Sequence, residues 1–357
     1  MNPKRPLIFH LLVFCAVCTI VSTMAVAQGN VSGTGSAVPR LAIRPPRPGP
    51  SNVQFPSGVL PEWNGSFTYN GTQYPYVMVG ADPSSNQGAL VTTWIIPVKI
   101  VLSTGQTFDP LSGGPFSPLA RTVLSPIFDS STTYVQGGVD VGTTQYLDAF
   151  QRANFWSIVS NNPNSHLLLG GPSSHIAILP ELTLNVPANE GQVGDPFGHQ
   201  VAEVDINYFD NQLSNYLTQS GVINPAGLPI FETTNTYLTE QGCCIAGYHT
   251  AQGAQTYMSF TYITYAGDYA EDVSALSAEV GDWADDPLYP APNSTPCGGL
   301  AVAGPANGAY PYQLHGFTYH LQDLVFLRYF GGPADGSVND WWSFQGYPFT
   351  QICQNGD

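Results

Sequence analysis

Residues 91–102 constrain the fold more than any other stretch of the chain. Their sequence, VTTWIIPVKIVL, is dominated by β-branched and aliphatic residues, which predicts a strand. Pro97 interrupts this stretch, and proline lacks the backbone N–H that a sheet ladder needs. We therefore expect a sheet in which this strand lies at an edge or carries a bulge.

Helix and strand patterns alternate along the rest of the sequence. The spacing of apolar residues predicts helices over 145–159, 206–217 and 271–284. Alternating or Thr-, Tyr- and Phe-rich segments predict strands over 181–186, 228–238 and 254–265, while 314–330 mixes both patterns. No strict βαβ rhythm is present, so the sequence predicts an α+β fold with a mixed sheet and a few packed helices in one domain, 61–357.

The N-terminus predicts export. Lys4 and Arg5 precede an apolar stretch, 7–21, and Ala25-Val26-Ala27 has the small-x-small pattern of a signal peptidase site. We expect a signal peptide over 1–27 and a secreted, bacterial-type protein, extracellular or periplasmic. A membrane anchor is the alternative, but the apolar stretch is shorter than the ~20 residues that a bilayer requires. No membrane span is expected.

The Pro-, Gly- and Ser-rich segment 28–60 predicts a linker or loosely docked arm.

The charge balance limits the partners of this chain. It has 9 Lys+Arg against 25 Asp+Glu, a formal net charge of −16 at pH 7. Nucleic acids and anionic membranes are bound through basic patches, so neither is an expected partner. Charged residues make up 10% of the chain and aromatic residues 12%, a composition typical of a globular protein rather than a disordered acidic one.

Four cysteines follow the predicted signal peptide, and an even number in an exported chain predicts two disulfides. A bond between neighbouring cysteines closes a strained ring. We therefore expect Cys243 and Cys244 each to pair with one of Cys297 and Cys353, with the connectivity open.

Several common active-site motifs are absent from the sequence. It has no G-x-S-x-G elbow, no P-loop, no G-x-G-x-x-G after a strand and no H-E-x-x-H. The histidines form no H-x-H or H-x₃-H pair, so a metal site would have to be assembled by the fold.

The segment 277–287, SAEVGDWADDP, resembles a helix of a secreted bacterial and fungal family that carries Ser-His-Glu-x-x-Glu-Trp-x-x-Asp-Pro. Plant EXORDIUM, or phosphate-induced, proteins are distantly similar. The resemblance covers roughly 90–353, and its other matching pieces are 145–156, 228–231, 242–249 and 319–324.

This resemblance implies a zincin-like domain with a metal site on the helix. Side chains four residues apart share one face of a helix, so the family's pattern implies ligands at positions 278 and 282 and a general base at Glu279. Here position 278 is Ala278, which offers no lone pair. A further acidic segment of the family corresponds to 297–305, where Ala301 replaces its glutamate.

Two missing ligands imply a metallopeptidase relative that is catalytically inactive, with Glu279 and Asp282 as vestiges of the site and no cofactor. One alternative is an active metal-dependent hydrolase that holds zinc through Asp282 with His249, His315 or His320. Another is an extracellular glycan- or envelope-binding protein that uses the aromatic residues of 340–344. The expected partner is an extracellular peptide or glycan.

Overall fold

The computed structural model describes residues 40–43, 58–69, 72–136, 139–170, 176–268, 270–285, 287, 311–314 and 316–320. All of them belong to one compact unit, Ala37–Asp357. The predicted signal peptide lies outside the described residues.

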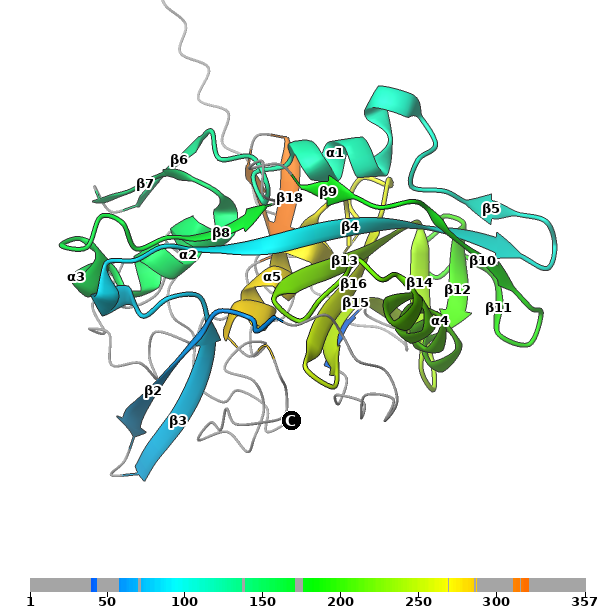
Figure 1. The fold of residues 1–357 in the computed structure, drawn as a ribbon. Helices are drawn as coiled ribbons and strands as arrows, with labels where there is room; N and C mark the ends of the chain where they lie inside the picture. Colours follow the sequence, from blue (N-terminus) through cyan, green and yellow to red (C-terminus); the bar gives the residue numbers. More distant parts are fainter. Residues whose placement is uncertain are drawn as a thin grey trace, which may run out of the picture. The chain divides into compact units, whose positions relative to one another are not determined.

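A 12-stranded mixed sheet forms the centre of this unit (Figure 1). Its strands are β1 (Arg40–Ile43), β4 (Ala89–Leu102), β5 (Thr107–Phe108), β8 (Leu167–Gly170), β9 (Ala177–Ile178), β10 (Leu182–Val186), β11 (Gly191–Gly194), β12 (Val201–Asp205), β13 (Gly227–Thr234), β14 (Thr236–Thr239), β15 (Cys243–Gln252) and β16 (Gln255–Tyr262). The main order is β10-β4-β13-β16-β15-β14-β12-β11; β5, β8 and β9 also pair with β4, and β1 pairs with β15. The β4–β13 and β13–β16 pairs are parallel, whereas β15 runs antiparallel to β14 and β16.

Three hairpins and several helices surround the sheet. The hairpins join β2 (Glu62–Tyr69) to β3 (Thr72–Val79), β6 (Thr132–Gln136) to β7 (Val139–Thr144), and β17 (Pro311–Leu314) to β18 (Phe317–His320). The helices are η1 (Pro83–Ser85), η2 (Gly114–Phe116), α1 (Pro118–Leu124), α2 (Tyr146–Asn154), α3 (Trp156–Val159), α4 (Ile206–Gln219) and α5 (Ser274–Asp285). The predicted combination of a mixed sheet with packed helices is confirmed.

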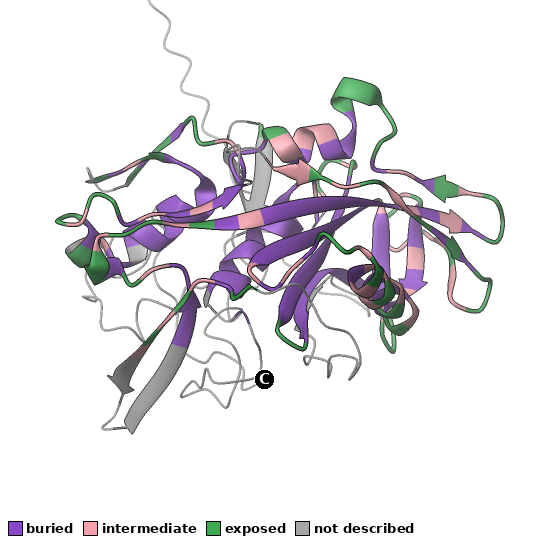
Figure 2. Cartoon of the chain, viewed as in Figure 1, coloured by how far each residue is buried: buried purple, intermediate pink, exposed green. Residues whose placement is uncertain are grey.

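The two faces of the sheet carry separate apolar cores. Helix α4 covers one face, where Phe209 and Leu213 pack with residues of β4, β12 and β15. Helices α1, α2 and α5 contribute to the core on the other face, which includes Leu276 and Trp283 of α5. Figure 2 shows the resulting burial of the central strands and of α5. The sheet is thus covered on both sides, which explains why several strands lack an alternating polar pattern.

Strand β4 is central, so the expectation that Pro97 marks an edge is wrong. β13 pairs with one side of β4, and Glu232 lies opposite Pro97. On the other side, β9 pairs with Trp94 and Ile95, and β10 begins its pairing at Val98. Pro97 therefore falls in the interval between two partner strands, where the ladder on that side is interrupted.

The predicted arm, 28–60, is described at 40–43 and 58–60. Residues 40–43 form β1, which lies parallel to β15, with Ile43 opposite His249. At least this part of the arm is integrated into the sheet.

None of the helices in the described ranges is both long and apolar enough to cross a bilayer.

Candidate metal centre

Helix α5 supplies two acidic side chains to the interior. The residues from Ser274 to Ala284 are all buried, so α5 is a core helix rather than an exposed acidic one. Its Trp283 indole N–H donates to Thr256 Oγ1 on β16 over 3.1 Å, which fixes the helix against the sheet. Glu279 and Asp282 are three residues apart and therefore project from the same side of α5.

Strand β15 brings a histidine to these two carboxyl groups. His249 Nδ1 lies 3.0 Å from Glu279 Oε2, and one potential ligand atom from each of His249, Glu279 and Asp282 lies within 4.8 Å of the others. The three residues are only 0%, 1% and 3% exposed, respectively. The fold thus collects three metal-ligating side chains from two elements in a buried position.

Gly247 makes this approach possible. A Cβ atom at this position would lie 3.0 Å from Ser259 O and 3.2 Å from Glu279 Cγ. Position 247 is two residues before His249, so both positions face the same side of β15. Sequence reasoning missed Gly247, although a glycine inside a strand is itself a sign of close approach.

The electrostatics of the cluster are dominated by burial. Glu279 Oε1 is buried and has no hydrogen-bond partner among the described residues. Burial raises the pKa of Glu279, and the hydrogen bond and charge of His249 oppose that rise. An incompletely satisfied carboxyl group in a core is costly, so this position favours either a retained proton or a bound cation.

The donor set fits a divalent transition metal. Imidazole nitrogen and carboxylate oxygen bind Zn²⁺ at about 2.0–2.2 Å, so ligand atoms around one ion lie at most about 4.4 Å apart. The three potential ligand atoms lie within 4.8 Å of one another, which is close to that spacing. With one nitrogen and two oxygen donors, the site suits Zn²⁺ or Mn²⁺ better than the thiol-preferring Cu⁺.

Some of the predicted ligand positions lie within the described residues and others do not. Ala278 is buried on α5 and contributes no ligand, while His249 reaches the acidic pair from the sheet instead. Strand β18, which ends at His320, packs against α5. The side chain of His320 and the whole of His315 and Ala301 lie outside the described residues.

The cysteines differ from the prediction. The structure joins Cys243 to Cys244 in a disulfide between neighbours at the start of β15. The prediction excluded this pairing because a ring between neighbouring cysteines is strained, but these two cysteines pair with each other. Cys297 and Cys353 lie outside the described residues.

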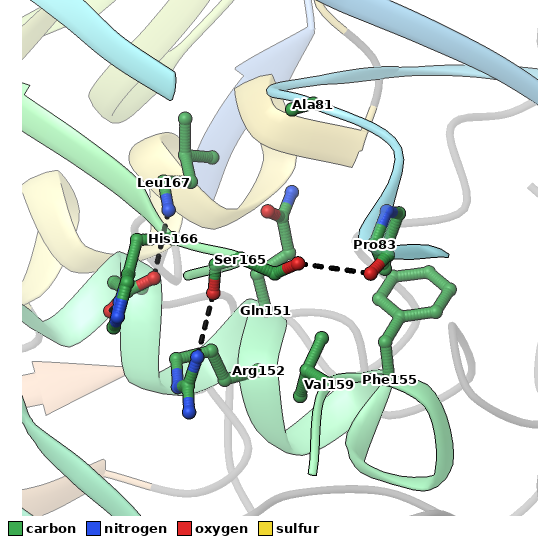
Figure 3. A pocket seen from close by; sticks show the side chains of 10 residues that line it. Ala81, Pro83, Gln151, Arg152, Phe155, Val159, Ser165, His166 and Leu167 are labelled. Atoms are coloured by element: carbon green, nitrogen blue, oxygen red, sulfur yellow. Dashed lines mark hydrogen bonds and ion pairs between the residues drawn. The ribbon is translucent and has the colours of Figure 1, made fainter. Parts of the chain in front are cut away.

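A second polar cluster lies around α2 (Figure 3). The buried Asp148 accepts hydrogen bonds from the Thr144 hydroxyl over 2.6 Å and the Leu167 N–H over 2.8 Å, and its Oδ2 lies 2.7 Å from His166 Nδ1. Arg152 donates to the Ser165 carbonyl over 2.6 Å. The cavity here is only ≈ 10 Å³, about the space of one water molecule. We assign this cluster to holding α2 against its neighbouring strands.

No family model, curated protein or solved structure matches this chain.

Proposed function

We propose that this chain is an exported, zincin-like metal-dependent hydrolase whose divalent cation is held by His249, Glu279 and Asp282. The observation that carries the proposal is the convergence of these three buried side chains from β15 and α5. It favours the active-hydrolase alternative over a relative whose metal site has been lost.

Charge supports a cation at this position. With both carboxyl groups ionised, Glu279 and Asp282 would bring a charge of −2 into the core, where charge is costly. A divalent cation would neutralise that charge and satisfy Glu279 Oε1, which is buried without a hydrogen-bond partner among the described residues. The raised pKa of Glu279 describes the competing state, in which a proton takes the place of the metal.

The proposal also explains how a chain that resembles a zincin-like family can hold a metal without a histidine at position 278. The imidazole that Ala278 lacks would be supplied by His249 from the neighbouring strand. Three protein ligands leave a coordination position open, and a metal bound there polarises water or a carbonyl group for hydrolysis. The chain's own residues hold the cation and fix its position, because α5 is anchored to the sheet through Trp283.

Metal analysis tests the proposal directly. The purified protein is stripped with chelator, titrated with Zn²⁺ by calorimetry and compared with His249→Gln and Asp282→Asn. We expect one zinc ion per chain in the natural protein and at least a tenfold weaker affinity in each variant. His166→Gln is the matched control, because His166 also lies beside a buried carboxylate, Asp148, but belongs to the cluster around α2.

Two outcomes separate the parts of this proposal. Absence of stoichiometric zinc binding by the natural protein would reject the metal site and favour the inactive relative. Tight zinc binding without hydrolysis of unstructured peptides or esters would keep the metal site and reject the hydrolase.

A further inference from the structure

Glu232 is a buried carboxyl group that the proposed metal site does not use. It lies in β13, a strand whose residues are all buried, between Pro97 on β4 and Phe260 on β16. Glu232 is 0% exposed. It shares a face of β13 with Ile230, which belongs to the core beneath α1 and α5.

Neither oxygen of Glu232 has a hydrogen-bond partner among the described residues. The hydroxyl of Thr122, on α1, faces this carboxyl group but is itself buried without a bond of hydrogen-bonding geometry. Most buried polar side-chain atoms in proteins are paired, so an acid with two unpaired oxygens requires an explanation.

Other ionisable groups lie on the elements next to this position. Tyr262, on β16, is the group that connects them: burial raises its pKa most, and Arg121 on α1, Asp272 just before α5 and Glu232 also influence its ionisation. Arg121 Nε donates to the Tyr262 hydroxyl over 2.5 Å, and Arg121 Nη2 donates to the Gly316 carbonyl over 3.2 Å. The neighbouring β4 presents Pro97, which carries no charge.

Helix α1 is a small cover for such a group. It has seven residues, Pro118–Leu124; it buries Pro118, Leu119 and Thr122, whereas Leu124 is 67% exposed. Elements with few buried contacts open at a lower free energy than the whole domain, so α1 can lift without global unfolding.

We propose that Glu232 is held beneath α1 as the neutral carboxylic acid and acts as a pH-dependent latch. While Glu232 keeps its proton, α1 stays seated on the sheet. When the proton is lost, the carboxylate requires water, and α1 lifts to admit it. The lifting widens the hollow of ≈ 290 Å³ that Arg121 and Tyr262 help to line.

The direction of the pH dependence follows from burial. Burial raises the pKa of Glu232 well above the usual 4.5, and the Thr122 hydroxyl opposes that rise. Below pH 4.5 the closed and open states are both protonated, so the latch contributes its full stability. As the pH rises from 4.5 towards the raised pKa, only the open state ionises, and the closed state becomes less favoured.

Hydrogen exchange of the full chain tests this latch. Between pH 4.5 and 7.5, the opening equilibrium of the α1 amides, corrected for intrinsic exchange rates, should increase by up to tenfold per pH unit. The amides of α4, on the opposite face of the sheet, should not show this increase. Measurements with chelator and with excess Zn²⁺ should agree, because the latch is separate from the proposed metal site.

Glu232→Gln should abolish the pH dependence at α1, whereas Glu240→Gln, at an exposed position, should leave it unchanged. An α1 opening equilibrium in the natural protein that does not change with pH overturns the proposal. An undiminished pH dependence in Glu232→Gln overturns it as well. Should Glu232→Gln fail to fold, the comparison of α1 with α4 in the natural protein decides.

Discussion

At the scale of single residues, Gly247 provides the space that the side chain of Glu279 occupies. Its missing Cβ allows Glu279 Cγ to lie directly over the backbone of β15. His249 follows two positions later on the same face and meets the carboxyl group. The geometry of the proposed metal site therefore depends on a residue that offers no ligand.

Gly247→Ala should weaken zinc binding about five- to tenfold, because the added methyl group displaces the Glu279 carboxylate by a few tenths of an ångström. Calorimetric titration beside the natural protein measures the effect. Gly88→Ala is the matched control, since its Cβ would lie 3.2 Å from Asn164 O and not beside Glu279. Equal zinc affinities in the natural protein and Gly247→Ala would show that Glu279 is not a ligand.

Part of the site follows from the sequence alone. The spacing of Glu279 and Asp282 places them on one side of a helix, and the helix itself is predicted from apolar periodicity. The choice of His249 among three candidate histidines does not follow, because it depends on which strand lies beneath α5. That arrangement is set by long-range pairing, which leaves no local pattern.

At the scale of elements, β15 is a strand that the sequence pattern does not predict. All but the first of its residues are buried, so the sequence has no alternation of polar and apolar positions. The strands β4 and β16 are predicted within a few residues of their observed limits because β-branched and aromatic residues predominate in them, and β10 is predicted from its alternation of apolar and polar residues. Helix 145–159 is divided into α2 and α3 at Phe155, where the backbone leaves helical geometry.

β1 provides an element-scale prediction. It pairs with β15 beside His249 although it belongs to the segment predicted as an arm. In such a strand only alternate residues turn their N–H towards the partner. One of the two variants Leu41→Pro and Ala42→Pro therefore removes an N–H that bonds to β15. That variant should lower the free energy of unfolding by about 1–3 kcal/mol.

Urea denaturation measures this loss, and Leu41→Ala, which keeps its backbone N–H, is the control for the side chain. If both proline variants matched Leu41→Ala in stability, β1 would be a loosely docked arm, as its composition predicts.

At the scale of the whole molecule, β4 joins the two cores. Ile95 belongs to the core beneath α1, α2 and α5, whereas its neighbour Ile96 belongs to the core beneath α4. Both side chains are 0% exposed. Because one strand contributes to both cores, loss of packing on either face weakens the same set of ladder hydrogen bonds.

Ile95→Ala and Ile96→Ala should each lower the free energy of unfolding by about 2–4 kcal/mol, the usual loss for a truncated core aliphatic residue. Unfolding should remain a single transition when followed by tryptophan fluorescence and by circular dichroism. Two separated transitions in either variant would mean that the cores unfold independently.

The position of β4 in the sheet also affects how the chain is made. A ribosome releases residues 89–102 long before β13, their central partner, because the whole of 103–226 intervenes. During that interval an apolar strand with an unpaired edge is exposed to solvent and to other nascent chains. Synthesis therefore creates a period in which this apolar strand lacks its partner and is prone to aggregate, and truncation before 227 should leave an insoluble product.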